Sequence, residues 1–244
     1  MLELLGRAED AMTVAAIATH LKVPKSSALT LLRALVAAEF CVVDDQGRYA
    51  LGIRSFEVGA AYLRSMTPVR SVTPELRWLT ATLGVTSHFA VLDREEVIYL
   101  AKHDPPDLGL KLASSLGARL PAAVTAVGKA QLAYPVPADR GGTGRPAAPG
   151  GSESSSSQGL STELQLVRER GYAVDEGEAA VGIRCVAAPL FNDRCCCGAI
   201  GVSYLLGGGP ASTAVTEALL EAAQRASDRL GGRLGGFLSK EHQR

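Results

Sequence analysis

The sequence lacks the features that mark membrane and secreted proteins. No apolar run approaches the roughly 18–20 residues that a membrane-spanning helix requires. The first ten residues already carry Glu3, Arg7, Glu9 and Asp10, which a secretory signal would not contain. We therefore expect a protein of the cytoplasm that has no membrane partner.

Cysteine pairs at metal-ligand spacing are also lacking. None of the five cysteines forms a C-x-x-C pair with another, and Cys195, Cys196 and Cys197 are adjacent. Neighbouring residues on a strand point to opposite faces, so these three cannot converge on one metal ion without ligands from elsewhere. We expect small buried core residues and no metal site.

Catalytic signatures are missing as well. The four histidines lie in separate segments without ligand spacing, and no P-loop, dinucleotide fingerprint or nucleophile with a base is present. Asp175, Glu176 and Glu178 form an acidic cluster that we interpret as a solvated turn. The sequence thus predicts no catalytic residue, no cofactor and a protein that is not an enzyme.

An overall excess of positive charge is lacking too, since 25 Lys and Arg residues face 25 Asp and Glu residues. The local distribution is more informative. Between Ala11 and Ala38 there is no acidic residue, whereas His20, Lys22, Lys25 and Arg33 lie inside this segment. Residues 1–65 nevertheless hold seven basic and seven acidic side chains, so the electrostatic argument for nucleic-acid binding is local and modest.

What is present near the N-terminus is a helix-turn-helix pattern. Residues 1–6 resemble a short helix. Thr13 is suited to cap a helix from Val14 to Leu21, which Pro24 separates from a second helix. The apolar stripe of the first of these two helices consists of Val14, Ile17, Ala18 and Leu21, and that of the second of Ala28, Leu31, Leu32 and Leu35.

A strand, a turn and a second strand follow, which is the order of a winged helix. Cys41–Val43 and Arg48–Leu51 flank an Asp-Asp-Gln-Gly turn in which Gly47 supplies a positive φ. We place the winged helix-turn-helix domain at residues 1–54 and a linker helix at 55–71.

The remaining residues, 72–244, mix strands and helices without strict alternation, which favours an α+β sensor domain. Thr73 and Pro74 predict the start of its first helix, and Thr125 the N-cap of a later one. Residues 135–159 are rich in Pro, Gly and Ser and nearly devoid of large apolar groups, so we expect a disordered loop there.

Taken in order, these elements resemble the isocitrate lyase regulator (IclR) family of bacterial transcription factors. The resemblance covers nearly the whole chain, and its two most specific segments are RGYAVDEGE and VGIRCVAAPLF. The segments that carry it are TVAAIA at 13–18, VPKSS at 23–27, LLRAL at 31–35, GRYALG at 47–52, LP at 120–121, TAVGKA at 125–130, RGYAVDEGE at 170–178 and VGIRCVAAPLF at 181–191.

The resemblance implies a winged-helix domain, a linker helix and a C-terminal effector-binding domain related to the GAF and profilin-like folds. It also implies a homodimer or tetramer that binds palindromic double-stranded promoter DNA. A small organic effector, often a carboxylate or an aromatic compound, is expected to change the action of the protein on transcription.

Candidate DNA-binding residues lie off the apolar stripe of the second helix, where a recognition helix meets the major groove. Hydroxyl and ammonium groups there suit phosphates and base edges, and a leucine suits a thymine methyl. The candidates are Lys25, Ser26, Ser27, Leu29, Thr30 and Arg33, with Arg48 beside the wing turn. Family members commonly carry arginine at the position of Thr30 and glycine at that of Glu39, so weaker or altered operator binding is expected.

Candidate effector-binding residues follow from the resemblance. The matching positions are Ala126, Val127, Asp175, Ile183, Cys185 and Ser203, and Leu110 and Leu112 are looser candidates for an apolar wall. A helix that starts after Thr125 offers free backbone N–H groups to a carboxylate. Gly201 stands where some members carry serine, which predicts a wider or less polar pocket, and Lys129 is expected to have a structural role.

One alternative from another class of proteins stays open at this stage. The chain could be a small-molecule-binding or enzymatic module whose N-terminal domain serves protein contacts only. The weak basic balance and Thr30 favour this alternative slightly, whereas the missing catalytic residues count against it.

Overall fold

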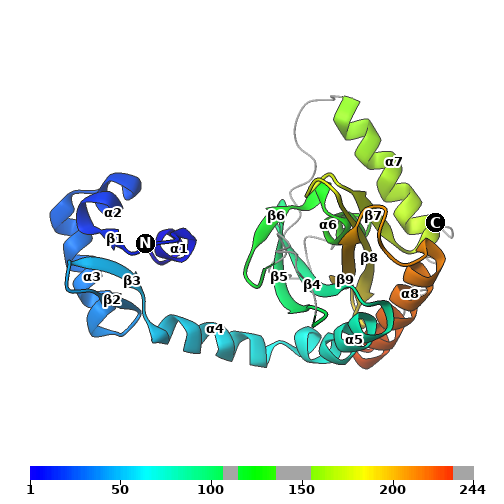
Figure 1. The fold of residues 1–244 in the computed structure, drawn as a ribbon, viewed down its shortest axis with the longest axis horizontal. Helices are drawn as coiled ribbons and strands as arrows, with labels where there is room; N and C mark the ends of the chain where they lie inside the picture. The colour runs from blue at the N-terminus through cyan, green and yellow to red at the C-terminus, as the bar shows by residue number, and fades with distance from the viewer. Residues whose placement is uncertain (107–114, 136–154, 233–244) are drawn as a thin grey trace. The chain divides into compact units, whose positions relative to one another are not determined.

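A computed structural model describes residues 1–106, 115–135 and 155–232 of the chain (Figure 1). The chain divides into two compact units, Met1–Ser65 and Met66–Arg244. The looser candidates Leu110 and Leu112, and residues 136–154 of the expected loop, lie outside the described residues. The architecture is of the α+β class, as expected from the sequence.

The first unit has the winged helix-turn-helix order. Its elements are α1 (Leu2–Arg7), β1 (Met12–Thr13), α2 (Val14–Leu21), α3 (Lys25–Ala37), β2 (Cys41–Val43), β3 (Arg48–Leu51) and α4 (Ile53–Ser65). The strands form one antiparallel sheet in the order β1-β3-β2.

Local chemistry explains where these helices begin and end. The Thr13 hydroxyl accepts a hydrogen bond from the Ala16 N–H at 3.3 Å and so caps α2, as predicted. Lys22 takes the left-handed conformation that ends α2, with φ of 54°. Ile17 and Leu32, one from each helix, are completely buried and form the centre of the small core.

Leu31 was wrongly assigned to this core. The side chain is 50% exposed, whereas Ala28 and Leu32 are buried and Leu35 and Val36 are packed against them. The buried stripe of α3 therefore runs through positions 28, 32, 35 and 36. Successive residues of a helix are rotated by about 100° around its axis, so Leu31 lies at the edge of this stripe.

The wing turn has the predicted chemistry. Gly47 adopts φ of 72°, which costs an L-amino acid more than glycine. The Asp44 carboxylate accepts hydrogen bonds from the backbone N–H groups of Gln46 at 3.0 Å and Arg48 at 2.8 Å. These bonds hold the turn in one conformation.

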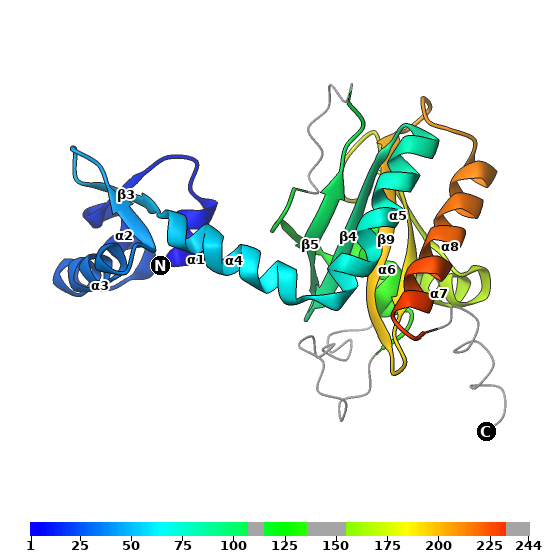
Figure 2. The same ribbon diagram turned by 90° about the horizontal axis from the view of Figure 1, so that it is seen from below.

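The second unit is built on a six-stranded antiparallel sheet in the order β6-β5-β4-β9-β8-β7. Helices α5 and α8 lie side by side on one face of this sheet, and α6 covers the other (Figure 1 and Figure 2). The elements are α5 (Thr67–Leu83), β4 (Thr86–Asp93), β5 (Glu96–His103), β6 (Arg119–Pro121), the 3-10 turn η1 (Ala122–Val124), α6 (Ala126–Leu132), α7 (Ser155–Arg170), β7 (Ala173–Glu176), β8 (Ile183–Phe191), β9 (Cys196–Leu205) and α8 (Ser212–Arg229).

An ion-pair network ties α5 to α8. The buried carboxylate of Glu75 accepts hydrogen bonds from Arg225 at 2.8 Å and from Arg229. The Arg225 guanidinium also lies 4.1 Å from the centre of the Trp78 ring. The two helices thus form one layer over the sheet.

Two sequence predictions about helix starts in this unit were wrong. Thr73 is not an N-cap and Pro74 lies inside α5, which begins at Thr67 with a proline already in its first turn. The Thr73 hydroxyl donates to the Val69 carbonyl at 2.7 Å and so supports the helix next to the missing proline N–H. The expected loop at 135–159 is also shorter than predicted, because residues 155–159 belong to α7.

None of the helices within the described ranges is long and apolar enough to cross a membrane.

Replacing Glu39 by glycine is expected to stabilise the first unit. Glu39 follows Ala38, the C-cap of α3, and adopts φ of 62°, a left-handed conformation that costs glycine least. The free energy of opening measured by hydrogen exchange at α2 and α3 amides should rise by about 0.5–1 kcal/mol. Ala38→Gly is the matched control, since φ there is −89° and glycine should destabilise. Equal effects of both variants would contradict the prediction.

Candidate functional site

The outward face of α3 presents the candidate DNA-binding residues. Lys25, Ser26, Ser27, Thr30 and Arg33 are all exposed, and no acidic side chain lies on this helix. The Thr30 hydroxyl donates to the Ser26 carbonyl at 3.0 Å, so its hydrogen is already used within the helix. Ser26, Ser27 and the two basic residues are the groups that remain to meet phosphates and base edges.

Two of the four leucines on this helix differ from the sequence prediction. Leu29 is half-buried, whereas Leu31 is exposed. An exposed leucine beside Ser27 and Thr30 is better placed than Leu29 to contact a thymine methyl group.

Arg48 lies at the start of β3, beside the wing turn, and is exposed. Its Nε donates to the Asp44 carboxylate at 2.8 Å. This ion pair offsets the charge of Arg48, so the wing offers less attraction to a phosphate than the arginine alone would.

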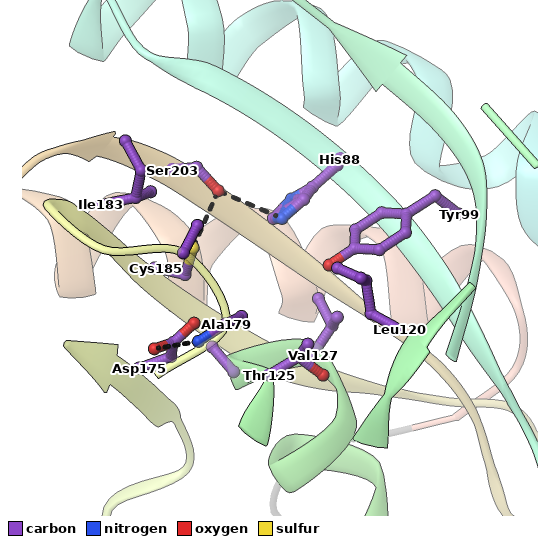
Figure 3. Close-up of a pocket in the computed structure, with 12 residues that line it drawn as sticks. His88, Tyr99, Leu120, Thr125, Val127, Asp175, Ala179, Ile183, Cys185 and Ser203 are labelled. Atoms are coloured by element: carbon purple, nitrogen blue, oxygen red, sulfur yellow. Dashed lines mark hydrogen bonds between the residues drawn. The ribbon is translucent and has the colours of Figure 1, made fainter. Parts of the chain in front are cut away.

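A cavity in the second unit brings together the six effector candidates that the structure describes. It lies between α6 and the strands of the six-stranded sheet, each of which contributes at least one residue to its wall, and Figure 3 shows the side chains converging on it. The predicted residues in its wall are Ala126, Val127, Asp175, Ile183, Cys185 and Ser203, and the others are His88, Tyr99, Leu120, Thr125, Ala179 and Ala180.

The cavity is small in this conformation. Its volume is about 30 Å³, which is enough for one or two water molecules. The segment from Gly177 to Gly182 forms part of the wall through Ala179 and Ala180, and both end glycines adopt positive φ. An organic effector therefore requires movement of the wall.

Asp175, on β7, is the charged group in the wall. Its exposure is only 1%, so the sequence interpretation as a solvated turn was wrong for this residue. Its Oδ1 accepts hydrogen bonds from the N–H group of Glu178 at 2.7 Å and from that of Ala179 at 3.4 Å. Figure 3 shows the second of these bonds. Burial raises the pKa of the Asp175 carboxyl above its ordinary value, although these bonds and Lys129 act in the opposite direction.

Three polar side chains from neighbouring strands form a connected row. Cys185 Sγ lies 3.0 Å from Ser203 Oγ, and Ser203 Oγ lies 3.4 Å from His88 Nε2 (Figure 3). Burial lowers the pKa of His88 to about 3, with a smaller contribution from Lys102, and raises the pKa of Cys185 to about 12. At neutral pH the row therefore consists of an uncharged imidazole, a hydroxyl and a thiol.

Gly201 does not widen the pocket, contrary to the sequence prediction. A Cβ atom at this position would lie 2.7 Å from His88 Cε1 and 3.1 Å from Val127 Cγ1. The space left by the missing side chain is filled by the His88 imidazole, which is the register partner of Gly201 in the β4–β9 pair. The His88 imidazole thus occupies the space by which the pocket was expected to be wider.

Lys129 has a structural role, as its position after the helix start suggested. Its ammonium is 1% exposed and pairs with Glu163 of α7 at 2.8 Å and with Glu178 at 2.5 Å. Burial alone would lower the pKa of Lys129, but hydrogen bonds to these two carboxylates outweigh it and raise the pKa. Lys129 thereby anchors the segment from Gly177 to Gly182 to α6.

The sequence did not identify His88, Tyr99, Leu120, Ala179 and Ala180 as cavity residues. His88 is the most informative omission, because a histidine among the buried residues at the start of a strand was a signal of a polar interior site. Its ring stacks on Tyr99, with the ring centres 5.2 Å apart. The residues that face His88 are determined by the register between the strands. The composition of the sequence and the spacing of its motifs do not show this register.

Within the described residues, no three His, Cys, Asp or Glu side chains are arranged to hold a metal ion. Cys196 is buried and its neighbours Cys195 and Cys197 are partly buried. Burial raises the pKa values of the Cys196 and Cys197 thiols, and these thiols donate to the carbonyls of Gly198 and Leu190.

Comparison with family models covers both units of the chain. Residues 60–228 match the model of the C-terminal domain of the bacterial transcriptional regulator IclR. Residues 1–45 match the model of the IclR helix-turn-helix domain. The two matches together extend over most of the chain.

Individual proteins agree with the family models. The HTH-type transcriptional repressor AllR of Salmonella typhimurium is 28% identical over 227 residues, which is 90% of this chain and 80% of that protein. An IclR transcriptional regulator from Alicyclobacillus acidocaldarius is 30% identical, with a TM-score of 0.77 over 94% of this chain and 95% of that one. An IclR homologue from Microbacterium hydrocarbonoxydans, complexed with 4-hydroxybenzoate, is 20% identical, with a TM-score of 0.74 over 92% and 93% of the two chains.

Asp175→Asn is expected to stabilise the protein at neutral pH. Since the folded-state pKa is raised, ionised Asp175 lowers stability above that pKa, and the penalty disappears as the pH falls below it. Asparagine retains the acceptor for Glu178 and Ala179 without the charge. Urea denaturation should show a gain on the order of 1 kcal/mol at pH 7 that vanishes near pH 4. A gain that is constant with pH would disprove this origin, and Asp228→Asn on α8 serves as the control.

Proposed function

The chain belongs to the IclR family of bacterial DNA-binding transcriptional regulators, and on this premise we propose which residues bind DNA, bind the effector and join subunits. Family membership makes the second unit the effector-binding domain. The observation that carries the proposal is the cavity, in which six effector candidates from α6, β7, β8 and β9 converge.

We infer that the effector binds between the polar row on the strands and the start of α6. The row Cys185–Ser203–His88 supplies hydrogen bonds, while Val127, Ile183 and Tyr99 supply apolar contacts. A polar side opposite an apolar side suits a small organic acid or a hydroxylated aromatic compound. The 4-hydroxybenzoate complex of the Microbacterium homologue supports this class of ligand.

We infer that Lys25, Ser26, Ser27 and Arg33 of α3 contact the major groove, with Thr30 facing it as well. Their exposure on one helix, the absence of acidic residues there and the following wing support this role. Leu31 takes the apolar contact that the sequence analysis gave to Leu29, and Arg48 remains a phosphate contact weakened by Asp44.

No observation favours an enzyme. The Cys185 thiol has a pKa near 12, so it is not a thiolate nucleophile at neutral pH. We therefore propose that the protein acts in the cytoplasm by binding and not by turnover, and that no cofactor takes part.

The test combines DNA binding with ligand binding. A gel shift of the full chain against its own upstream region should give a sequence-preferring complex that weakens with salt. Thermal shift with 4-hydroxybenzoate and other small carboxylates should raise the unfolding temperature for at least one ligand, because a ligand stabilises the state that it binds. Failure of the gel shift with this region and in an unbiased site selection would refute the assignment of α3.

Thr30→Arg is expected to strengthen DNA binding. The substitution adds a cation to the exposed face of α3 and removes only a hydrogen bond internal to the helix. Affinity should rise about tenfold at low salt for specific and nonspecific DNA alike, and the slope of log K against log salt should steepen by about 0.9. The matched control is Thr216→Arg on α8, where the hydroxyl makes the same type of bond to Ser212. An equal gain in the control would show a nonspecific charge effect.

We propose that a second copy of the chain covers α4. No side chain of this 13-residue helix is buried, and Ile53, Phe56, Val58 and Tyr62 are each more than half exposed. A helix of this length with no buried side chain is only marginally stable in water. A homodimer also fits the two half-sites of a palindromic operator.

Phe56→Glu is expected to shift the assembly toward monomer. Phe56 is 70% exposed, so the substitution removes apolar area from the proposed interface without opening a cavity in the described chain. Analytical ultracentrifugation should show a dimer or tetramer for the wild type and at least a tenfold weaker association for the variant. Glu3→Lys on α1 is the control for surface charge. A monomeric wild type at micromolar concentration would overturn the proposal.

A further inference from the structure

The central strand β4 places a histidine in the cavity that neither sequence motif nor family resemblance assigned to the site. His88 is 1% exposed, and its Nε2 lies 3.4 Å from the Ser203 hydroxyl oxygen. Its other ring nitrogen, Nδ1, is fully buried and has no hydrogen-bond partner among the described residues. The two nitrogens of this ring are therefore in unequal environments.

This inequality selects one tautomer of the neutral imidazole. A buried N–H without an acceptor is rarer in proteins than an acceptor without a donor. The proton therefore belongs on Nε2, which has an acceptor in Ser203 Oγ, and the lone pair belongs on Nδ1. The Nε2–H group of His88 then donates to Ser203.

The direction of this hydrogen bond determines what Ser203 offers to a ligand. Its hydroxyl accepts from His88, so its own hydrogen points away from the imidazole, toward Cys185 and the cavity. Cys185 is the register partner of Asp175, and burial together with this carboxylate raises the pKa of the thiol and so favours its protonated form. The donors of His88 and Ser203 therefore point in the same direction, from His88 toward Cys185.

We propose that His88 is a positioning residue for effector recognition: by donating to Ser203 Oγ, it leaves the Ser203 hydrogen to turn from Cys185 to a carbonyl or carboxylate oxygen of the effector. The inference rests on the proposed effector site. It adds that His88, through Ser203, makes the site prefer ligands that carry a hydrogen-bond acceptor. Tyr99 supports the ring by stacking, and Gly201 leaves the space that the ring needs.

The imidazole performs this role without a charge. Burial and the nearby charge of Lys102 lower the pKa of His88 and outweigh Asp104, which raises it, so the His88 pKa of about 3 lies far below neutrality. A carboxylate is then recognised by a fixed hydroxyl dipole and not by an ion pair. A ligand that carries an ammonium group in place of this carboxylate has no acceptor for the Ser203 hydroxyl.

The first experiment measures the tautomer directly and needs no effector. In the full chain labelled with ¹⁵N-histidine, two-bond couplings should show His88 as the neutral Nε2–H form, unchanged between pH 8 and pH 5. Its signals are assigned by their loss in His88→Gln. An Nδ1–H tautomer, or titration of this ring in that range, would overturn the inference.

The second experiment measures ligand selection by calorimetry. The probes are 4-hydroxybenzoate, a series of two- to six-carbon carboxylates and the cationic analogue 4-hydroxybenzylamine. For each carboxylate that binds the wild type, His88→Leu should weaken affinity about tenfold, the equivalent of one hydrogen bond. His88→Gln, which carries an N–H at the place of Nε2, should recover most of this loss, and 4-hydroxybenzylamine should bind none of the three proteins.

Equal affinities of His88→Leu and His88→Gln, with both variants folded by circular dichroism, would refute the positioning role. A wild type that binds none of the carboxylates would count against the proposed effector function instead. In that case the tautomer measurement still decides the inference about His88.

Discussion

The pairing of β9 with its two neighbours, β4 and β8, is the constraint on which the effector-binding unit depends. This register brings Ser203 opposite Thr86 on one side and Cys185 on the other, and places Gly201 beside His88. Side chains alternate along a strand, so a slip by one residue would move Ser203 to the face covered by α5 and α8. Two glycines of β9 reinforce the register. A Cβ atom at Gly198 would meet the Phe89 ring, and a Cβ atom at Gly201 would meet the His88 ring. Packing and recognition therefore depend on the same backbone alignment.

Such a site lowers the stability of the unit. Asp175, His88 and Lys129 are ionisable groups with almost no exposure, and burial disfavours the charged form of each. Each group is compensated differently. Lys129 keeps its charge through two glutamates, His88 loses it, and Asp175 accepts two backbone N–H groups. Buried polar groups that destabilise a core are typical of binding sites. Their donors and acceptors that have no partner in the protein can form hydrogen bonds with a ligand.

Local sequence chemistry predicted most of the fold but only part of the site. The α2 cap at Thr13, the turn at Gly47 and the α6 cap at Thr125 follow from interactions within three or four residues, and these predictions were confirmed. The helix start predicted at Pro74 was wrong, because proline starts many helices but here an earlier proline already occupies the first turn of α5. Leu31 and Leu32 both fit an apolar stripe that passes through Ala28 and Leu35, and which of the two is more deeply buried depends on the tertiary packing of α3. His88 required knowledge of which residue of β9 lies beside it, and that information resides in the tertiary structure.

The size of the cavity bears on how an effector acts. At about 30 Å³ the described conformation excludes a molecule as large as 4-hydroxybenzoate, so such a ligand binds a more open form. A ligand shifts the equilibrium only by its difference in affinity for the two forms, and its apparent affinity falls with the fraction of open molecules. The segment from Gly177 to Gly182 is held closed by Asp175 and by Lys129 through Glu178. Because Asp175 also lines the cavity, the carboxylate that holds this segment is one of the groups that a bound effector meets.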